Sequence, residues 1–115
     1  QCTAEVVRVM SPKVFWPAPK VDSAIVRLVV DPERRAAIPD RQYFKDFTRA
    51  LFLHKRKFLR ANAVAALKHH LDKPQVDALL EAMQFSPEAR TEQINIPTLL
   101  RFAELARAAA PDWKL

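Results

Sequence analysis

The chain has 115 residues, of which 50% are hydrophobic and 28% are charged, and this composition excludes a largely disordered protein. Nineteen lysine and arginine residues against thirteen aspartate and glutamate residues give a net charge of +6, which favours a polyanionic partner. No apolar run approaches the ~20 residues of a membrane-spanning helix, so we expect no association with a membrane. These values favour a cytoplasmic protein, and we expect a monomer.

The absence of glycine is the most unusual feature of the composition. At average usage of about 7%, roughly eight glycines would be expected, and cofactor-binding α/β domains concentrate them in phosphate-cradling turns. We therefore expect no cofactor-binding residues in this chain. We expect no metal site either, since Cys2 is the only cysteine and His69 and His70 project in different directions from a helix. Because Gln1 leads at once into a strand-like segment, we expect a piece of a larger protein.

The first predicted elements are two short strands, Ala4–Met10 and Ser23–Val30, both rich in β-branched residues. Each carries one arginine near its middle, Arg8 and Arg27, which suits an antiparallel pair with one wetted face. Two strands alone are only marginally stable. We therefore expect them to be the end of a larger sheet.

Between the strands lies a loop, residues 14–23, with the sequence V-F-W-P-A-P-K-V-D-S. Its two prolines fix φ near −65° and push the preceding residues toward extended conformations, so Phe15 and Trp16 lie on a stiff segment. Such a loop can hold a ring ready to stack on a flat ligand, above all a nucleobase, at low entropic cost. The alternative, which the residues alone favour, is that both aromatics pack against the core or a linker.

Beyond residue 31 the pattern changes twice. Residues 32–39 predict a linker, because they are polar and include Pro32 and Pro39. From Asp40 onward hydrophobic residues recur about every 3.6 positions, so residues 40–115 predict a bundle of four main helices. These are Arg41–Leu53 with Phe44, Phe47 and Leu51 inward; Lys57–Leu71 with Leu59, Ala63, Ala66, Leu67 and Leu71 inward; a third opened by Asp72 and Pro74 with Val76, Leu79, Leu80 and Met83 inward; and a last opened by Asn95 and Pro97 with Leu99, Phe102, Ala103 and Ala106 inward before Pro111.

The densest positive cluster of the chain, His54–Arg60 (H-K-R-K-F-L-R), lies between the first two predicted helices. Its four fixed charges, on Lys55, Arg56, Lys57 and Arg60, repel one another, and solvent or a polyanion such as a phosphate backbone relieves that cost. Alternatively, the cluster is the solvated end of a helix whose C-terminal dipole the cations complement. The residues alone leave these two interpretations open.

Three stretches together resemble the KsgA-type ribosomal RNA adenine dimethyltransferases, the dimethyladenosine transferases. The loop is similar to the F-x-P-x-P-K-V-D-S signature that, followed by A-I-V-R-L, closes the catalytic domain of that family. Residues 55–60 are similar to the family's R-R-K-x-L-R-N run, although Ala61 stands in place of the asparagine, and residues 89–94 resemble its R-x-E-x-L element. The related Erm enzymes share the loop but do not usually carry the basic turn.

This resemblance implies the C-terminal portion of an enzyme that uses S-adenosylmethionine to dimethylate N6 of two adjacent adenines. The implied substrate is the 3′-terminal hairpin of small-subunit ribosomal RNA, during ribosome biogenesis. On the family pattern Phe15 stacks on the target adenine in catalysis, whereas Trp16 keeps its interpretation as a packing residue. The RNA-binding residues that we expect are Lys20, Lys55, Arg56, Lys57 and Arg60.

The implied fold is mainly α. Residues 1–31 would be the last two antiparallel strands of an α/β methyltransferase sheet, and residues 40–115 a four-helix RNA-recognition domain. The family's N-[LI]-P-[YF] motif and its glycine-rich cofactor turn do not occur in the chain, so we expect this portion alone to be inactive. The competing hypothesis is a non-enzymatic helical module that binds RNA or another protein.

Overall fold

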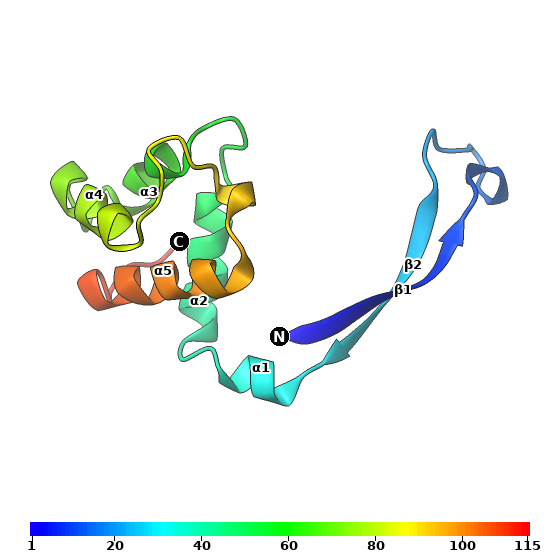
Figure 1. Cartoon of the computed structure of the whole chain (residues 1–115), viewed down its shortest axis with the longest axis horizontal. Coiled ribbons are helices and arrows are strands. Elements are labelled where there is room, and N and C mark those ends of the chain that lie inside the picture. The colour runs from blue at the N-terminus through cyan, green and yellow to red at the C-terminus, as the bar shows by residue number, and fades with distance from the viewer. The chain divides into compact units, whose positions relative to one another are not determined.

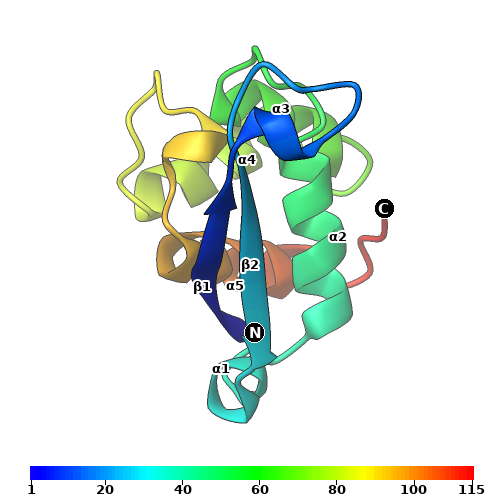
Figure 2. The ribbon, with the colours of Figure 1, turned by 90° about the vertical axis from the view of Figure 1, so that its right-hand side faces the viewer.

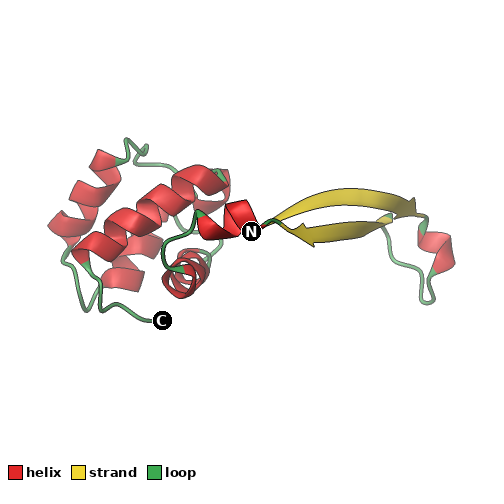
Figure 3. Ribbon diagram, turned by 90° about the horizontal axis from the view of Figure 1, so that it is seen from below, coloured by secondary structure: helices red, strands yellow, loops and turns green.

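The computed structural model describes all 115 residues, and the chain divides into two compact units, Gln1–Pro39 and Asp40–Leu115 (Figure 1). The first unit holds two strands and a short α-helix, and the second holds four α-helices (Figure 3). The predicted fold class, mainly α with one antiparallel pair of strands, is confirmed. None of the helices is both long and apolar enough to cross a membrane.

The first unit is built on a β-hairpin. Strands β1 (Cys2–Met10) and β2 (Ser23–Val30) pair in antiparallel orientation and lie side by side in Figure 2. The register shifts between Val6 and Arg8, so β1 carries an irregularity of the β-bulge type there. Both predicted strands are therefore present, and β1 begins at Cys2 rather than at Ala4.

No residue of the hairpin is fully buried, because two strands alone have no second layer to pack against. Glu5 and Arg27 lie opposite each other in the ladder and form an exposed ion pair of 3.0 Å. An exposed pair of this kind contributes at most about 1 kcal/mol, so the backbone ladder is the main element that holds the strands together. Arg27 thus lies on a wetted face, as its position in the strand predicts.

The residues predicted to form a linker contain helix α1 (Pro32–Ala36). The Asp31 carboxylate caps this helix by accepting hydrogen bonds from the backbone N–H groups of Glu33 and Arg34, at 3.0 and 3.2 Å. The Arg34 guanidinium in turn donates to the carbonyl of Cys2 at 3.2 Å, which ties α1 to the start of β1. The stretch has structure of its own because an aspartate N-cap precedes a proline at the first helical position.

The second unit packs helices α2 (Arg41–Leu51), α3 (Leu59–Leu67), α4 (Lys73–Ala82) and α5 (Ile96–Ala109) around one apolar core. At its centre the Phe47 ring meets Phe102 and Trp113 edge-on, with ring centroids 5.4 and 5.5 Å apart. Such contacts add about 0.5–1.5 kcal/mol each beyond area burial. The other buried hydrophobic residues are Tyr43, Ala50, Leu51, Leu59, Ala63, Leu67, Leu71, Val76, Leu80, Leu99, Ala103, Ala106 and Ala110.

Three helices of this unit begin at the predicted polar residues. The side chains of Asp40, Asp72 and Asn95 each accept a hydrogen bond from a backbone N–H three residues later, at 3.0, 2.9 and 2.9 Å. The side chain of Gln75 in turn accepts a hydrogen bond from the backbone N–H of Asp72, which completes a capping box. Helix α3 differs, because Phe58 precedes it and offers no capping side chain.

Two of the predicted helices are longer than the real ones. The first ends at Leu51 instead of Leu53, and the second spans Leu59–Leu67 instead of Lys57–Leu71. Turns take the place of the extra helical residues that the sequence predicted. The N–H of Lys57 bonds to the carbonyl of His54 at 3.2 Å, and the N–H of Leu71 bonds to the carbonyl of Leu67 at 2.8 Å. Leu71 remains buried outside its helix, because this turn folds it back onto the core.

Four residues predicted to point inward, Phe44, Ala66, Leu79 and Met83, are only half-buried at the margin of the core. Tyr43 takes the buried place beside Phe44 that the hydrophobic pattern did not assign. Its hydroxyl donates to the carbonyl of Ala110 at 3.1 Å, so its polar atom is satisfied inside the bundle. The helix face is therefore rotated toward Tyr43.

Helix α4 ends without a glycine. Gln84 takes the left-handed conformation, with φ 58°, that glycine usually supplies after a helix. The N–H of Phe85 then bonds back to the carbonyl of Leu80 at 3.2 Å, and the Phe85 ring packs against Phe102 with centroids 5.4 Å apart. The contact between Phe85 and Phe102 stabilises this backbone conformation, although Gln84 adopts it less readily than glycine would.

Candidate nucleic-acid interface

We call residues 14–23 the aromatic-proline loop. A single 3-10 turn, η1 (Pro12–Val14), connects β1 to this loop. The Ser11 hydroxyl accepts the N–H of Lys13 at 3.3 Å, and the N–H of Phe15 bonds to the carbonyl of Pro12 at 3.2 Å. Phe15 itself has an extended backbone, with φ −112° and ψ 151°, and lies two residues before Pro17. The loop is thus held by local hydrogen bonds on one side and by fixed proline φ angles on the other.

The loop exposes both of its aromatic side chains. Phe15 is 39% exposed and Trp16 is 96% exposed. No residue of this chain covers the indole, so the packing role expected for Trp16 stays a prediction for the full-length protein. Lys20 is also exposed, and it takes part in none of the chain's four ion pairs.

We call residues 52–58, which join α2 to α3, the basic loop. Lys55, Arg56 and Lys57 are exposed there, and none of them forms an ion pair. They lie in a turn beyond the C-terminal end of α2 rather than within the helix. Three unpartnered positive charges on consecutive residues form a local site that favours an anion.

Asn62, on the inner face of α3, holds the basic loop from below. Its side chain is 2% exposed, and its amide Nδ2 donates to the carbonyl of His54 at 3.2 Å. Asn62 is not among the site residues predicted from the sequence, although its position carries a signal. A polar residue on the stripe that Leu59, Ala63 and Leu67 define is out of place unless it serves a hydrogen bond.

Residues 89–91 hold both ends of the basic loop. The Thr91 hydroxyl, which is buried, donates to the carbonyl of Leu51 at the end of α2, at 3.0 Å. The carbonyl of Ala89 accepts the N–H of Leu59 at the start of α3, at 2.7 Å. The Arg90 guanidinium lies over the Phe58 ring, 5.4 Å from its centroid. Residues 89–91 therefore position the basic loop, although the two stretches are far apart in the sequence.

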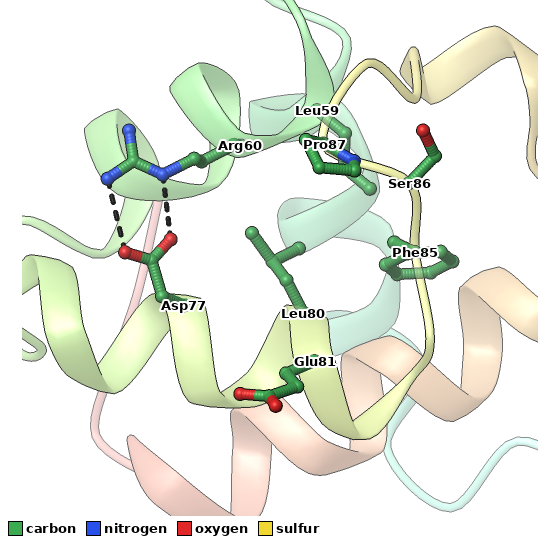
Figure 4. Close-up of a pocket in the computed structure, with 8 residues that line it drawn as sticks. All are labelled: Leu59, Arg60, Asp77, Leu80, Glu81, Phe85, Ser86 and Pro87. Atoms are coloured by element: carbon green, nitrogen blue, oxygen red, sulfur yellow. Dashed lines mark hydrogen bonds and ion pairs between the residues drawn. The ribbon is translucent and has the colours of Figure 1, made fainter.

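Arg60 is set apart from the other three cations. It forms two hydrogen bonds with the Asp77 carboxylate, at 2.7 and 3.1 Å, and so joins α3 to α4 (Figure 4). This hydrogen bonding raises the pKa of Arg60 and lowers the pKa of Asp77, so both groups stay charged. The pair borders a cleft of about 330 Å³ whose other lining includes Leu80 and Phe85. The charge of Arg60 is locally compensated, unlike that of Lys55, Arg56 and Lys57.

The chain is similar to known proteins over most of its length. Residues 1–105 match the family model described as Ribosomal RNA adenine dimethylase. The chain belongs to this family. Both the aromatic-proline loop and the basic loop of this chain lie within the residues that match the ribosomal RNA adenine dimethylase model.

Relatives and a solved structure agree with this assignment. The chain is 38% identical over 107 residues to the Ribosomal RNA small subunit methyltransferase A of Xanthomonas axonopodis pv. citri (strain 306), and 37% identical to that of Xanthomonas campestris pv. campestris (strain B100). Each match covers 93% of this chain and 38% of the relative. The chain thus spans well under half of the length of these curated relatives.

A dimethyladenosine transferase from Plasmodium falciparum has a similar fold. The match has a TM-score of 0.66 at 22% sequence identity, and covers 95% of this chain and 47% of that chain. At this identity the likeness concerns the fold alone. It supports the fold class predicted from the sequence.

Proposed function

We propose that the full-length protein transfers methyl groups from S-adenosylmethionine to N6 of adenines in small-subunit ribosomal RNA. Its target would be two adjacent adenines in the 3′-terminal hairpin, during ribosome biogenesis in the cytoplasm, and the enzyme would act as a monomer. The observation that carries the proposal is the family match over residues 1–105. Residues 1–31 would then close the catalytic domain, 32–39 would connect, and 40–115 would recognise RNA.

The chemistry explains why such an enzyme needs a ring like Phe15. The lone pair of an adenine N6 is delocalised into the base, so the amine is a poor nucleophile and must be aimed at the methyl donor. That requires the base to leave its stack and enter a site where an aromatic face holds it. Phe15 is partly exposed on a stiff loop, and a stacking contact of this kind is worth about 1–3 kcal/mol.

Phosphate contacts would come from both units. Lys20 follows the aromatic rings within the same loop, and Lys55, Arg56 and Lys57 present three uncompensated charges from the basic loop. Contacts of this kind fix the register of the RNA without reading its sequence. Arg60 joins α3 to α4 through Asp77, and because its side chain is half exposed we keep it as an RNA-contacting residue in this proposal.

We propose that the residues of this chain alone do not hold S-adenosylmethionine. The chain contains no glycine, and its two strands meet in a hairpin instead of leading into the N-terminus of a helix through a tight turn. We therefore propose that the cofactor is held by other residues of the full-length protein.

The test is methyl transfer by the full-length protein. With S-adenosylmethionine labelled on its methyl group, we expect label on N6 of both adenines of the hairpin, and none on a matched hairpin with guanines in their place. Tight binding of the hairpin without methyl transfer would favour the non-enzymatic module instead.

Phe15→Ala tests the stacking role within the same assay. We expect turnover to fall by about 10- to 100-fold, with a smaller loss of RNA affinity, because the ring positions the base while phosphate contacts hold the RNA. Val14→Ala, an exposed neighbour outside the motif, is the matched control and should retain turnover. Equal losses of turnover and affinity, or unchanged turnover, would count against Phe15 as the stacking ring.

A further inference from the structure

Trp16 is the most exposed large hydrophobic side chain of the chain, at 96%, against 73% for the next, Ile96. No aromatic ring pairs with its indole, and its N–H makes no hydrogen bond, whereas the buried Trp113 has both kinds of contact. Tryptophan carries a large apolar surface and is enriched at interfaces for that reason. An indole displayed in this way is open to a partner outside this chain.

Trp16 and Phe15 are neighbours in the loop but differ in exposure, at 96% and 39%. Their rings form no aromatic contact with each other, so each ring is available to a base separately. The loop offers two stacking surfaces, one partly shielded and one open.

The surroundings of Trp16 fit a nucleic acid better than an apolar partner. Pro17 and Pro19 follow it and stiffen the segment, which lowers the entropic cost of stacking. Lys13 and Lys20 flank the rings in the loop, and both are exposed and outside any ion pair. An aromatic platform beside free cations is the arrangement that binds single-stranded nucleic acid.

We propose that Trp16 stacks on the unpaired nucleotide next to the adenine that Phe15 holds. This inference rests on the proposed function, because it assumes an RNA with an extruded adenine at Phe15. Stacking on the neighbouring base tolerates any base, since every base has an aromatic face. It also requires that base to be free of its own stack, so Trp16 selects an unpaired loop over a continuous duplex.

A binding cycle with modified RNA tests this proposal. The full-length protein and its Trp16→Ala variant are titrated with a hairpin that has a single adenine among uridines in its loop. Two further hairpins carry an abasic residue directly 5′ or directly 3′ of that adenine. On the intact hairpin we expect Trp16→Ala to weaken binding about 5- to 100-fold, the range of one stacking contact. On one of the two abasic hairpins the variant and the unchanged protein should bind equally.

Two further variants control for the nature of the side chain. Trp16→Phe keeps an aromatic face and should stay within a few fold of the unchanged protein. Ile96→Ala removes another highly exposed apolar side chain and should change binding to none of the three hairpins.

The outcomes separate this inference from the proposed function. A loss that persists on both abasic hairpins, or no loss on the intact hairpin, overturns the stacking role of Trp16. A lower unfolding temperature for Trp16→Ala with unchanged RNA affinity also overturns it, and assigns the indole to packing within the full-length protein. Failure of the unchanged protein to methylate adenine is instead a failure of the proposed function, and it is measured separately.

Discussion

Individual residues in the second unit show how polar groups are accommodated in a small core. Tyr43 is buried, yet its hydroxyl reaches the carbonyl of Ala110 and leaves no unpaired donor. Burial raises the pKa of this hydroxyl to about 12, because the phenolate would lose its hydration inside the bundle. The folded state therefore holds the proton of Tyr43 more tightly than the unfolded chain does.

This shift gives the stability a dependence on pH with a defined sign. Below pH 10 the hydroxyl is protonated in both states, so its contribution is fully present. Between pH 10 and about 12 the unfolded chain loses the proton while the folded protein keeps it, so the free energy of unfolding falls as pH rises. Denaturant unfolding at pH 9 and pH 11 measures the fall. Tyr43→Phe should reduce it, and an unchanged slope in that variant would contradict the assignment.

At the scale of elements, the basic loop depends on a segment that follows it by more than thirty residues. The end of α2 is joined to Thr91 and the start of α3 to Ala89, so the loop between them is closed by both. Asn62 supports its middle through the carbonyl of His54. The three cations are therefore carried by a loop whose two ends are fixed.

Thr91→Val tests the support of the basic loop. Valine keeps the shape but removes the donor, which leaves the Leu51 carbonyl without its buried partner, so we expect a loss of about 1–3 kcal/mol in unfolding free energy. Thr98→Val is a suitable control, because Thr98 is half-buried in α5 and its hydroxyl has no such partner. Chemical denaturation of both variants measures the difference. Equal losses would show that the hydroxyl of Thr91 has no special role.

The charges of the basic loop make a separate prediction. If Arg56 and Lys57 contact phosphates, Arg56→Gln/Lys57→Gln should flatten the log–log dependence of RNA affinity on salt by about 0.7–0.9 per lost contact. The control Arg101→Gln/Lys114→Gln removes the same net charge from two exposed cations that form no ion pair. Salt titrations with the full-length protein and a small-subunit hairpin compare the two. Indistinguishable slopes would remove the RNA-binding role of the basic loop.

At the scale of the whole chain, the two units have different energetic status. Residues 40–115 enclose a core with several fully buried side chains, whereas residues 1–39 contain no buried residue. Burial of apolar surface is the dominant source of folding free energy, so the second unit is the one equipped to be stable by itself. The hairpin is supported by its ladder, the exposed Glu5–Arg27 ion pair and the hydrogen bond from Arg34 of α1 to the carbonyl of Cys2, without a core of its own.

The 115-residue chain by itself should not bind S-adenosylmethionine, since it has no turn that could cradle the cofactor. Isothermal titration calorimetry of this chain should give no heat of specific binding, whereas the full-length protein should bind. Micromolar binding by the isolated chain would overturn the placement of the cofactor site outside these residues.

The sequence by itself determined the types of both strands and of the four long helices, because these depend on local periodicity and capping, whereas helix α1 lies where a linker was predicted. The β-branched runs predicted both strands, and Asp40, Asp72 and Asn95 marked three helix starts by the polar side chains that cap them. The motifs also indicated the family before any comparison. The roles of Phe15, Lys20 and the basic loop remain predictions.

Only the tertiary structure decided which neighbours each residue has. No local pattern tells that Arg60 pairs with Asp77, that Thr91 reaches Leu51, or that Tyr43 replaces Phe44 at the core, since each depends on elements that meet after folding. The same holds for Trp16, whose apolar side chain predicted burial. Hydrophobicity states what a side chain gains from being covered, but the presence of a covering group is a property of the three-dimensional arrangement. In this chain that group is absent, and the indole is left open for a partner.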